Sequence, residues 1–96
     1  MPRKNNRRHP PKKRVYFKLK APKAEEVTLC GTFNNWETHS QRLRRDKKGV
    51  WGTSLVLEPG TYEYRFLVDG EWQNDPDAEM VAPNPYGTQN CVRMVV

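Results

Sequence analysis

The sequence predicts an all-β fold, a small antiparallel sandwich, and two observations lead to this prediction. From Val15 onward, apolar residues recur at every second position in several short runs, which is the period of a half-buried strand, and no helical stripe of useful length is present. Segments rich in Gly, Pro and Asn separate these runs. Short strands at such spacing are typical of a small sandwich.

We expect at least six strands, of which two precede a long polar segment. The first begins at Val15 and is broken by "APKA", and the second ends at Gly31. In the polar segment, Leu43 is the one residue expected to anchor the chain to the core. The inward-facing residues of these two strands are Val15, Phe17, Leu19, Val27 and Leu29.

Two longer runs of alternating residues lie on either side of "EPG", and we expect Trp51 of the first to lie in the core. Their inward-facing residues are Trp51, Thr53, Leu55 and Leu57, followed by Tyr62, Tyr64, Phe66 and Val68.

The dipeptide Asp69-Gly70 predicts a two-residue hairpin, because a type I′ turn needs positive φ at both central residues. In such a hairpin Leu67 faces Trp72, and cross-strand partners share a face of the sheet. Trp72 therefore lies on the side of Arg65 and points away from the core. Residues 73–90 are rich in Pro, Asn and Gly and are predicted to form a loop, and the last strand is predicted from Cys91 to Val96.

Basic residues are concentrated at the N-terminus. Seven of the 17 Lys and Arg residues fall in residues 1–14, which contain no acid, whereas the remaining 82 residues carry ten basic and 11 acidic side chains. We expect residues 1–14 to form a disordered basic tail and residues 15–96 to form one near-neutral domain. The sequence shows neither the apolar stretch of a signal peptide nor a run of about 18 apolar residues, so we expect a soluble, cytoplasmic protein with no membrane partner.

The two cysteines, Cys30 and Cys91, are expected to be reduced thiols on strands. A bridge of the immunoglobulin type is rejected for two reasons. Trp36 follows Cys30 too soon to be the tryptophan of that pattern, and Gln89 stands where its tyrosine corner would be.

Three aromatic residues lie where the core does not demand them: Trp36 in "GTFNNWET", Trp72 after the hairpin turn, and Tyr86 in "NPYGTQN". A folded body of about 80 residues has few apolar side chains to spare, so this placement is informative. Flat aromatic faces beside Asn, Thr and Arg suit a sugar. The C–H faces of the ring stack on an indole, and the hydroxyls pair with amide and guanidinium groups.

Three segments, "VTLCGTFNNW", "GTYEYRFLVDGEWQNDP" and "NPYGTQN", together resemble carbohydrate-binding module family 48. This family includes the glycogen-binding domain of AMP-activated protein kinase β subunits and the N-terminal modules of isoamylases and branching enzymes. The resemblance covers about Val15 to Val96. It implies an early-set, immunoglobulin-like β-sandwich that binds α-1,4-linked glucans (glycogen, starch, maltooligosaccharides or cyclodextrins) without cleaving them.

The resemblance also implies the binding residues: two tryptophans that stack on glucose rings, a polar pair near the C-terminal end, and two further positions. Arg65 stands where kinase-type members have a lysine, and its flat fork has a different geometry. Tyr86 takes the position of an apolar residue that reaches through the bent glucan. The candidate carbohydrate-binding residues are Trp36, Arg65, Trp72, Tyr86, Thr88 and Asn90.

Each candidate also has a structural interpretation. Trp36 could cover the edge of a thin core, and Trp72 could pack under a neighbouring loop. Arg65 could pair with Glu63 or Glu71 on a solvated face. The polar pair could form an ordinary turn before the last strand.

The sequence offers no support for catalysis. No pair of carboxylates lies in a recognisable catalytic motif, the two Cys and two His are scattered, and no glycine-rich phosphate loop is present, so no cofactor or metal is expected. The leading hypothesis is a non-catalytic α-glucan-binding module. The alternatives are a docking or regulatory domain for a glucan-metabolising enzyme or kinase, with weak sugar binding, and, less favoured, nucleic-acid binding through the tail.

Overall fold

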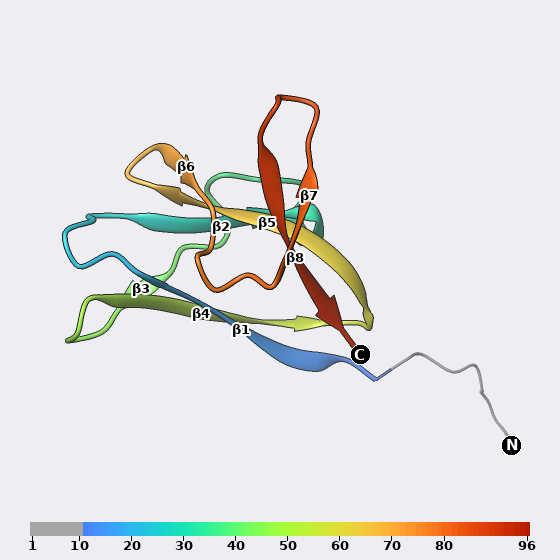
Figure 1. Ribbon diagram of the computed structural model, residues 1–96. Coiled ribbons are helices and arrows are strands. Elements are labelled where there is room, and N and C mark those ends of the chain that lie inside the picture. The colour runs from blue at the N-terminus through green and yellow to red at the C-terminus, as the bar shows by residue number, and fades with distance from the viewer. Residues whose placement is uncertain (1–10) are drawn as a thin grey trace, which may run out of the picture.

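The computed structural model describes residues 11–96, which form an all-β sandwich of two antiparallel sheets, as the sequence predicts (Figure 1). The smaller sheet has the order β1-β4-β3, formed by β1 (Lys13–Lys20), β4 (Val50–Leu57) and β3 (Arg44–Arg45). The larger sheet has the order β2-β5-β8-β7, and β6 pairs with β5. Its strands are β2 (Val27–Gly31), β5 (Gly60–Val68), β6 (Glu71–Gln73), β7 (Met80–Pro83) and β8 (Gln89–Val95).

The core lies between the two sheets and is built from the predicted alternating residues. Leu43 anchors the long polar segment, as expected, and Trp51 is buried with its indole N–H donating to the Ala21 carbonyl oxygen at 2.8 Å. The largest fully buried side chains are Tyr64, Phe17, Phe66, Leu29 and Val27, together with both cysteines. The inward and outward sides of the strands are therefore those that the period of two predicts.

The strand boundaries differ from the prediction at the N-terminus. The sequence predicts a disordered tail over residues 1–14; residues 1–10 lie outside the described residues, whereas Lys13 and Arg14 belong to β1. β1 begins at Lys13, two positions before Val15, because Lys13 and Arg14 continue the ladder opposite Leu57 and Val56 of β4.

The prediction that residues 73–90 form a loop is wrong for part of this segment. Met80–Pro83 form β7, which pairs with β8, with Val81 opposite Cys91. The four-residue run is short and lies among turn-forming residues, so its pairing is decided by β8 and not by its own pattern. Pro83 is tolerated because β7 is an edge strand. The last strand also begins earlier than predicted, at Gln89.

The segment between β6 and β7 is tied to the core by one buried contact. The hydroxyl of Tyr64 donates to a carboxylate oxygen of Asp75 at 2.7 Å, and Asp75 is itself buried. Burial, reinforced by the contact with Asp75, raises the pKa of Tyr64 well above its ordinary value, so the hydroxyl stays protonated.

Both cysteines are buried free thiols, as predicted. Cys30 lies opposite Arg65 in the ladder, whereas Cys91 lies opposite Tyr64, so the two thiols are on opposite faces of the larger sheet. Residues 11–96 contain no helix with the length and apolar character that crossing a bilayer requires.

Candidate functional site

An open groove of about 770 Å³ lies on the outer face of the larger sheet, between β6 and the loop that joins β7 to β8. All six residues that the sequence singles out line it: Trp36, Arg65, Trp72, Tyr86, Thr88 and Asn90. Thr32, Glu63, Asn84 and Pro85 complete the lining. Residues 54 positions apart in the chain therefore meet at one surface.

Trp36 is turned toward the groove by a tight turn after the short 3-10 helix Thr32–Asn34. The backbone N–H of Trp36 donates to the Gly31 carbonyl oxygen at 2.9 Å, and the Asn34 side chain accepts the Gly31 N–H at 3.1 Å. Asn35 and Trp36 have φ values of 56° and 60°, in the left-handed region that bulky residues rarely adopt. Such strain persists only where the surroundings impose it, and here it directs the indole away from the core.

Trp72 is placed by the hairpin that the sequence predicts. Asp69 and Gly70 have φ values of 48° and 85°, and Leu67 lies opposite Trp72 in the ladder. The Asp69 carboxylate also accepts the backbone N–H groups of Glu25 and Glu26, at 2.9 and 2.8 Å, which fixes the turn against the β1–β2 connection. Trp72 is consequently held with 43% of its surface exposed.

The two tryptophans lie side by side at a steep angle. Their ring centroids are 6.3 Å apart and the ring planes are inclined by 72°. Two sugar rings that stack on these indoles cannot be coplanar, so the pair suits a ligand that bends between adjacent rings.

Arg65 completes this aromatic corner. Its guanidinium carbon lies 5.9 Å from the Trp72 ring centroid, and its Nε donates to the Asn74 side-chain oxygen at 2.6 Å. A longer bond, 3.4 Å, joins Arg65 to the Thr88 hydroxyl. Arg65 does not form the alternative ion pair with Glu63 or Glu71: among residues 11–96, the one ion pair within 4.0 Å joins Arg42 to Glu26. The guanidinium still has N–H groups available for a ligand.

Asn84 organises the loop between β7 and β8. Its side-chain oxygen accepts the backbone N–H groups of Tyr86 and Thr88, at 3.0 and 3.2 Å, and its amide nitrogen donates to the Thr88 hydroxyl at 2.8 Å. The same nitrogen donates to the Asn90 side-chain oxygen at 2.9 Å. The loop thereby holds Tyr86 at its tip, where 89% of the residue is exposed.

Asn90 lies at the floor of the groove, in a different setting from Tyr86. Only 8% of it is exposed, and its amide nitrogen donates to a Glu63 carboxylate oxygen at 3.0 Å. The amide oxygen accepts the bond from Asn84, so Asn90 has one N–H and one lone pair left.

Sequence reasoning missed Glu63, Asn84 and Asn74 as parts of this site. Glu63 carried a signal, since it lies two positions from Arg65 on the same outward face of β5. Asn84 and Asn74 lie in segments rich in Asn and Pro, where no spacing distinguishes an organising amide from an ordinary turn residue.

The groove is suited to holding a sugar in place. Glu63 is the one carboxylate in its lining, whereas glycoside cleavage uses two. Within residues 11–96, no group of three or more Cys, His, Asp or Glu side chains is arranged to hold a metal ion. What remains is an aromatic corner beside hydroxyl, amide and guanidinium groups.

Comparison with known proteins also indicates a sugar-recognition site. Residues 14–96 match the family described as the glycogen recognition site of AMP-activated protein kinase. The chain is 43% identical over 70 residues to the chloroplastic protein FLOURY ENDOSPERM 6 of Oryza sativa subsp. japonica, which covers 73% of this chain and 13% of the relative. It is 38% identical over 66 residues to the 5'-AMP-activated protein kinase subunit beta-2 of Homo sapiens, covering 69% of this chain and 23% of the subunit.

A plant kinase subunit is similar to the same extent. The SNF1-related protein kinase regulatory subunit beta-2 of Arabidopsis thaliana is 38% identical over 68 residues, covering 71% of this chain. The chain spans less than a quarter of the length of each of these three relatives. The family match extends from β1 to the last residue, and the chain therefore belongs to the glycogen-recognition family of the AMP-activated protein kinase.

Proposed function

We propose that the groove binds α-1,4-linked glucans by stacking glucose units on Trp36 and Trp72, without cleaving them. The observation that carries this proposal is the indole pair that lines the groove, 6.3 Å apart and inclined by 72°, with Trp72 exposed, Trp36 half-buried and Arg65 against the Trp72 ring. Successive glucose units in an α-1,4 chain turn relative to one another, so they can meet two inclined faces. A flat chain would stack on only one of them.

The polar residues have separate tasks in this proposal. Arg65 and the Thr88 hydroxyl bond to sugar hydroxyls at the rim of the groove, and Tyr86 covers the ligand from the loop tip. Asn90 contributes its remaining N–H from the floor. Each neutral bond adds about 0.5–1.5 kcal/mol net, so affinity depends on several contacts acting together with the stacking.

The test is retardation of the full chain in a gel containing glycogen, and titration with maltoheptaose. The double variant Trp36→Ala plus Trp72→Ala is expected to abolish both, whereas Tyr16→Ala, which removes an exposed aromatic from the opposite sheet, is expected to change neither. Binding is expected to be insensitive to salt and to removal of residues 1–10. Unchanged retardation of the double variant would overturn the proposal.

The module is also proposed to act as one part of a larger assembly. Relatives that contain the matching segment are named as kinase subunits, and one is named a regulatory subunit. A glucan-bound module of this kind would bring a kinase or a glucan-metabolising enzyme to its polymer. Purification of the endogenous protein with a kinase or such an enzyme at constant stoichiometry would support this, and its elution alone would contradict it.

The cytoplasm remains a prediction for the location of the chain. Two plant relatives are named as chloroplastic, so a plastid is the alternative location for a protein that carries this segment. Fractionation of the source cells with an antibody to the chain tests the prediction, and recovery in an organelle fraction would contradict it.

A further inference from the structure

The near-neutral net charge of the folded part conceals a separation of charge between its two halves. Residues 11–48 carry 11 basic and four acidic side chains, whereas residues 49–96 carry two basic and seven acidic ones. Much of the basic half belongs to the smaller sheet and the turn that joins β3 to β4. The groove lies on the larger sheet, so the basic charge gathers away from the sugar site.

The cations of the smaller sheet line up on its outer face. On β1, the exposed residues Arg14, Lys18 and Lys20 alternate with buried apolar residues. Lys18 lies opposite Gly52 of β4, and Gly52 lies opposite Arg44 of β3, so two cations flank a position that has no side chain. We call the surface formed by Arg14, Lys18, Lys20 and Arg44 the basic face.

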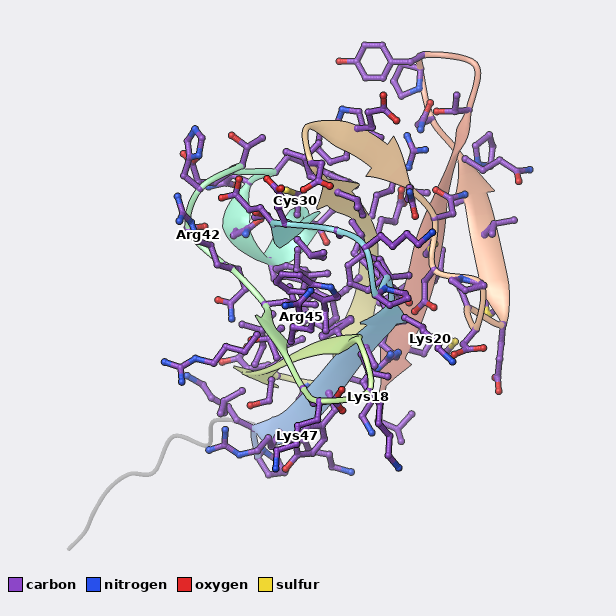
Figure 2. The ribbon with its side chains drawn as sticks, turned by 90° about the vertical axis from the view of Figure 1, so that its left-hand side faces the viewer. Lys18, Lys20, Cys30, Arg42, Arg45 and Lys47 are labelled. Atoms are coloured by element: carbon purple, nitrogen blue, oxygen red, sulfur yellow. The ribbon has the colours of Figure 1, made fainter. Side chains whose placement is uncertain are left out.

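Other cations nearby already have structural partners, which separates them from the basic face. Arg45 lies 5.7 Å from the Trp51 ring centroid and donates to the Pro22 carbonyl oxygen at 3.2 Å, and Arg42 pairs with Glu26 at 3.4 Å. On the basic face, the Arg14 guanidinium donates to the Ser54 hydroxyl at 3.1 Å. Figure 2 shows Lys18 and Lys20 on strand β1, in the half of the molecule away from Cys30.

One carboxylate borders this face and is already occupied. Asp46 accepts the backbone N–H groups of Lys48 and Val50, at 2.8 and 3.0 Å, and so closes the β3–β4 turn. These bonds, together with the charges of Lys48 and Lys18, lower the pKa of Asp46. With Asp46 engaged by the backbone, the four cations of the basic face still outnumber this acid.

The basic face also carries exposed apolar surface. Tyr16 is 60% exposed and Val56 is 50% exposed, and both share the outward side with Arg14, which lies opposite Val56. Protein interfaces combine aromatic and Arg side chains with apolar area, whereas a phosphate backbone needs cations alone. The mixture therefore favours a protein as the occupant over a nucleic acid.

We propose that the basic face is a docking surface for an acidic segment of a partner protein, one that presents carboxylates and an apolar side chain on the same face of an extended strand. Along β1 the outward side chains of Arg14, Tyr16, Lys18 and Lys20 follow one another at every second residue, about 6–7 Å apart, which is the spacing of alternate side chains in any extended peptide. Carboxylates at that spacing reach Lys18 and Lys20, while an apolar side chain two residues further along, on the same face of the peptide, meets Tyr16 and Val56. Because this face and the groove lie on different sheets, glucan and partner bind at the same time.

The probe for this proposal is a fluorescent ten-residue peptide in which two glutamates and a valine occupy successive alternate positions with serine between them, and a glutamine-for-glutamate peptide is its neutral counterpart. Binding to the full chain is followed by anisotropy at low salt. The variant Lys18→Gln plus Arg44→Gln is expected to weaken binding about tenfold, since an exposed ion pair contributes up to about fivefold. The charge-matched control Lys12→Gln plus Lys23→Gln is expected to change it less than about threefold.

Three further arms decide the identity of the occupant. Val56→Thr keeps the shape and all charges, and is expected to weaken peptide binding about two- to threefold by removing apolar contact. Saturating β-cyclodextrin is expected to leave peptide affinity unchanged. The proposal is overturned if the neutral peptide binds equally well, if the two double variants lose equal affinity, or if single-stranded DNA or phosphatidylserine vesicles bind more tightly than the peptide through Lys18 and Arg44.

Discussion

Replacing Trp72 with alanine removes one of the two stacking faces and leaves the scaffold of the groove in place. Trp72 is 43% exposed, and a tryptophan side chain presents at most roughly 250 Å² in total, so about 100 Å² is available to a ligand. At about 25 cal/mol per Å², covering half of that surface contributes roughly 1.3 kcal/mol and covering all of it roughly 2.5 kcal/mol. Since 1.4 kcal/mol is tenfold in affinity, the variant is expected to bind β-cyclodextrin about 10- to 60-fold more weakly.

Isothermal titration calorimetry at two salt concentrations measures this loss. Tyr16→Ala is the matched control, because it deletes a more exposed aromatic ring from the opposite sheet. Trp72→Phe keeps a smaller ring and is expected to fall between the wild type and Trp72→Ala. A loss below about threefold for Trp72→Ala, or an equal loss for Tyr16→Ala, would refute the stacking role of this residue.

Gly31→Ala is expected to lower the free energy of unfolding by about 1–3 kcal/mol, because the new methyl group would lie 2.5 Å from a backbone carbonyl oxygen. Gly52→Ala, whose nearest atom would be at 3.6 Å, is expected to cost little, and urea unfolding of both variants tests this difference. Cys30 and Cys91 are buried, and burial together with the nearby Glu37 raises the pKa of Cys30 to about 11. Both thiols are therefore expected to react with a thiol reagent only after unfolding, and rapid labelling of the native protein would contradict this. Backbone hydrogen bonds lower the pKa of Asp46 below its ordinary value of 3.8, so the contribution of this carboxylate to folding stability is present above that value and is lost as pH falls through the folded pKa. The urea midpoint of Asp46→Asn should therefore fall less steeply in acid than that of the wild type, and parallel curves would count against this role of Asp46.

Much of the fold follows from local chemistry that is visible in the sequence. The period of two separates inward from outward residues on the long strands, and Asp69-Gly70 fixes the hairpin register that places Trp72 beside Arg65. These features depend on neighbouring residues in one segment, so they can be derived without knowing the rest of the molecule.

The remaining features depend on contacts between distant segments. The direction of Trp36 results from two consecutive left-handed residues, and no local pattern identifies that conformation at a tryptophan. Asn84 becomes an organising residue only once β7 and β8 pair. The charge separation is likewise invisible in the net charge of the folded part, because the basic excess of residues 11–48 and the acidic excess of residues 49–96 largely offset each other.

The three indole N–H groups test the central claim most directly, because one of them serves as an internal control. Trp51 is buried and its indole donates to a backbone carbonyl, whereas Trp36 and Trp72 line the groove. In a ¹H–¹⁵N spectrum of the full chain titrated with maltoheptaose, the Trp36 and Trp72 indole signals are expected to shift together and saturate at one affinity, while the Trp51 signal stays in place. Movement of the Trp51 signal alone, or no movement of the other two at saturating sugar, would contradict the account.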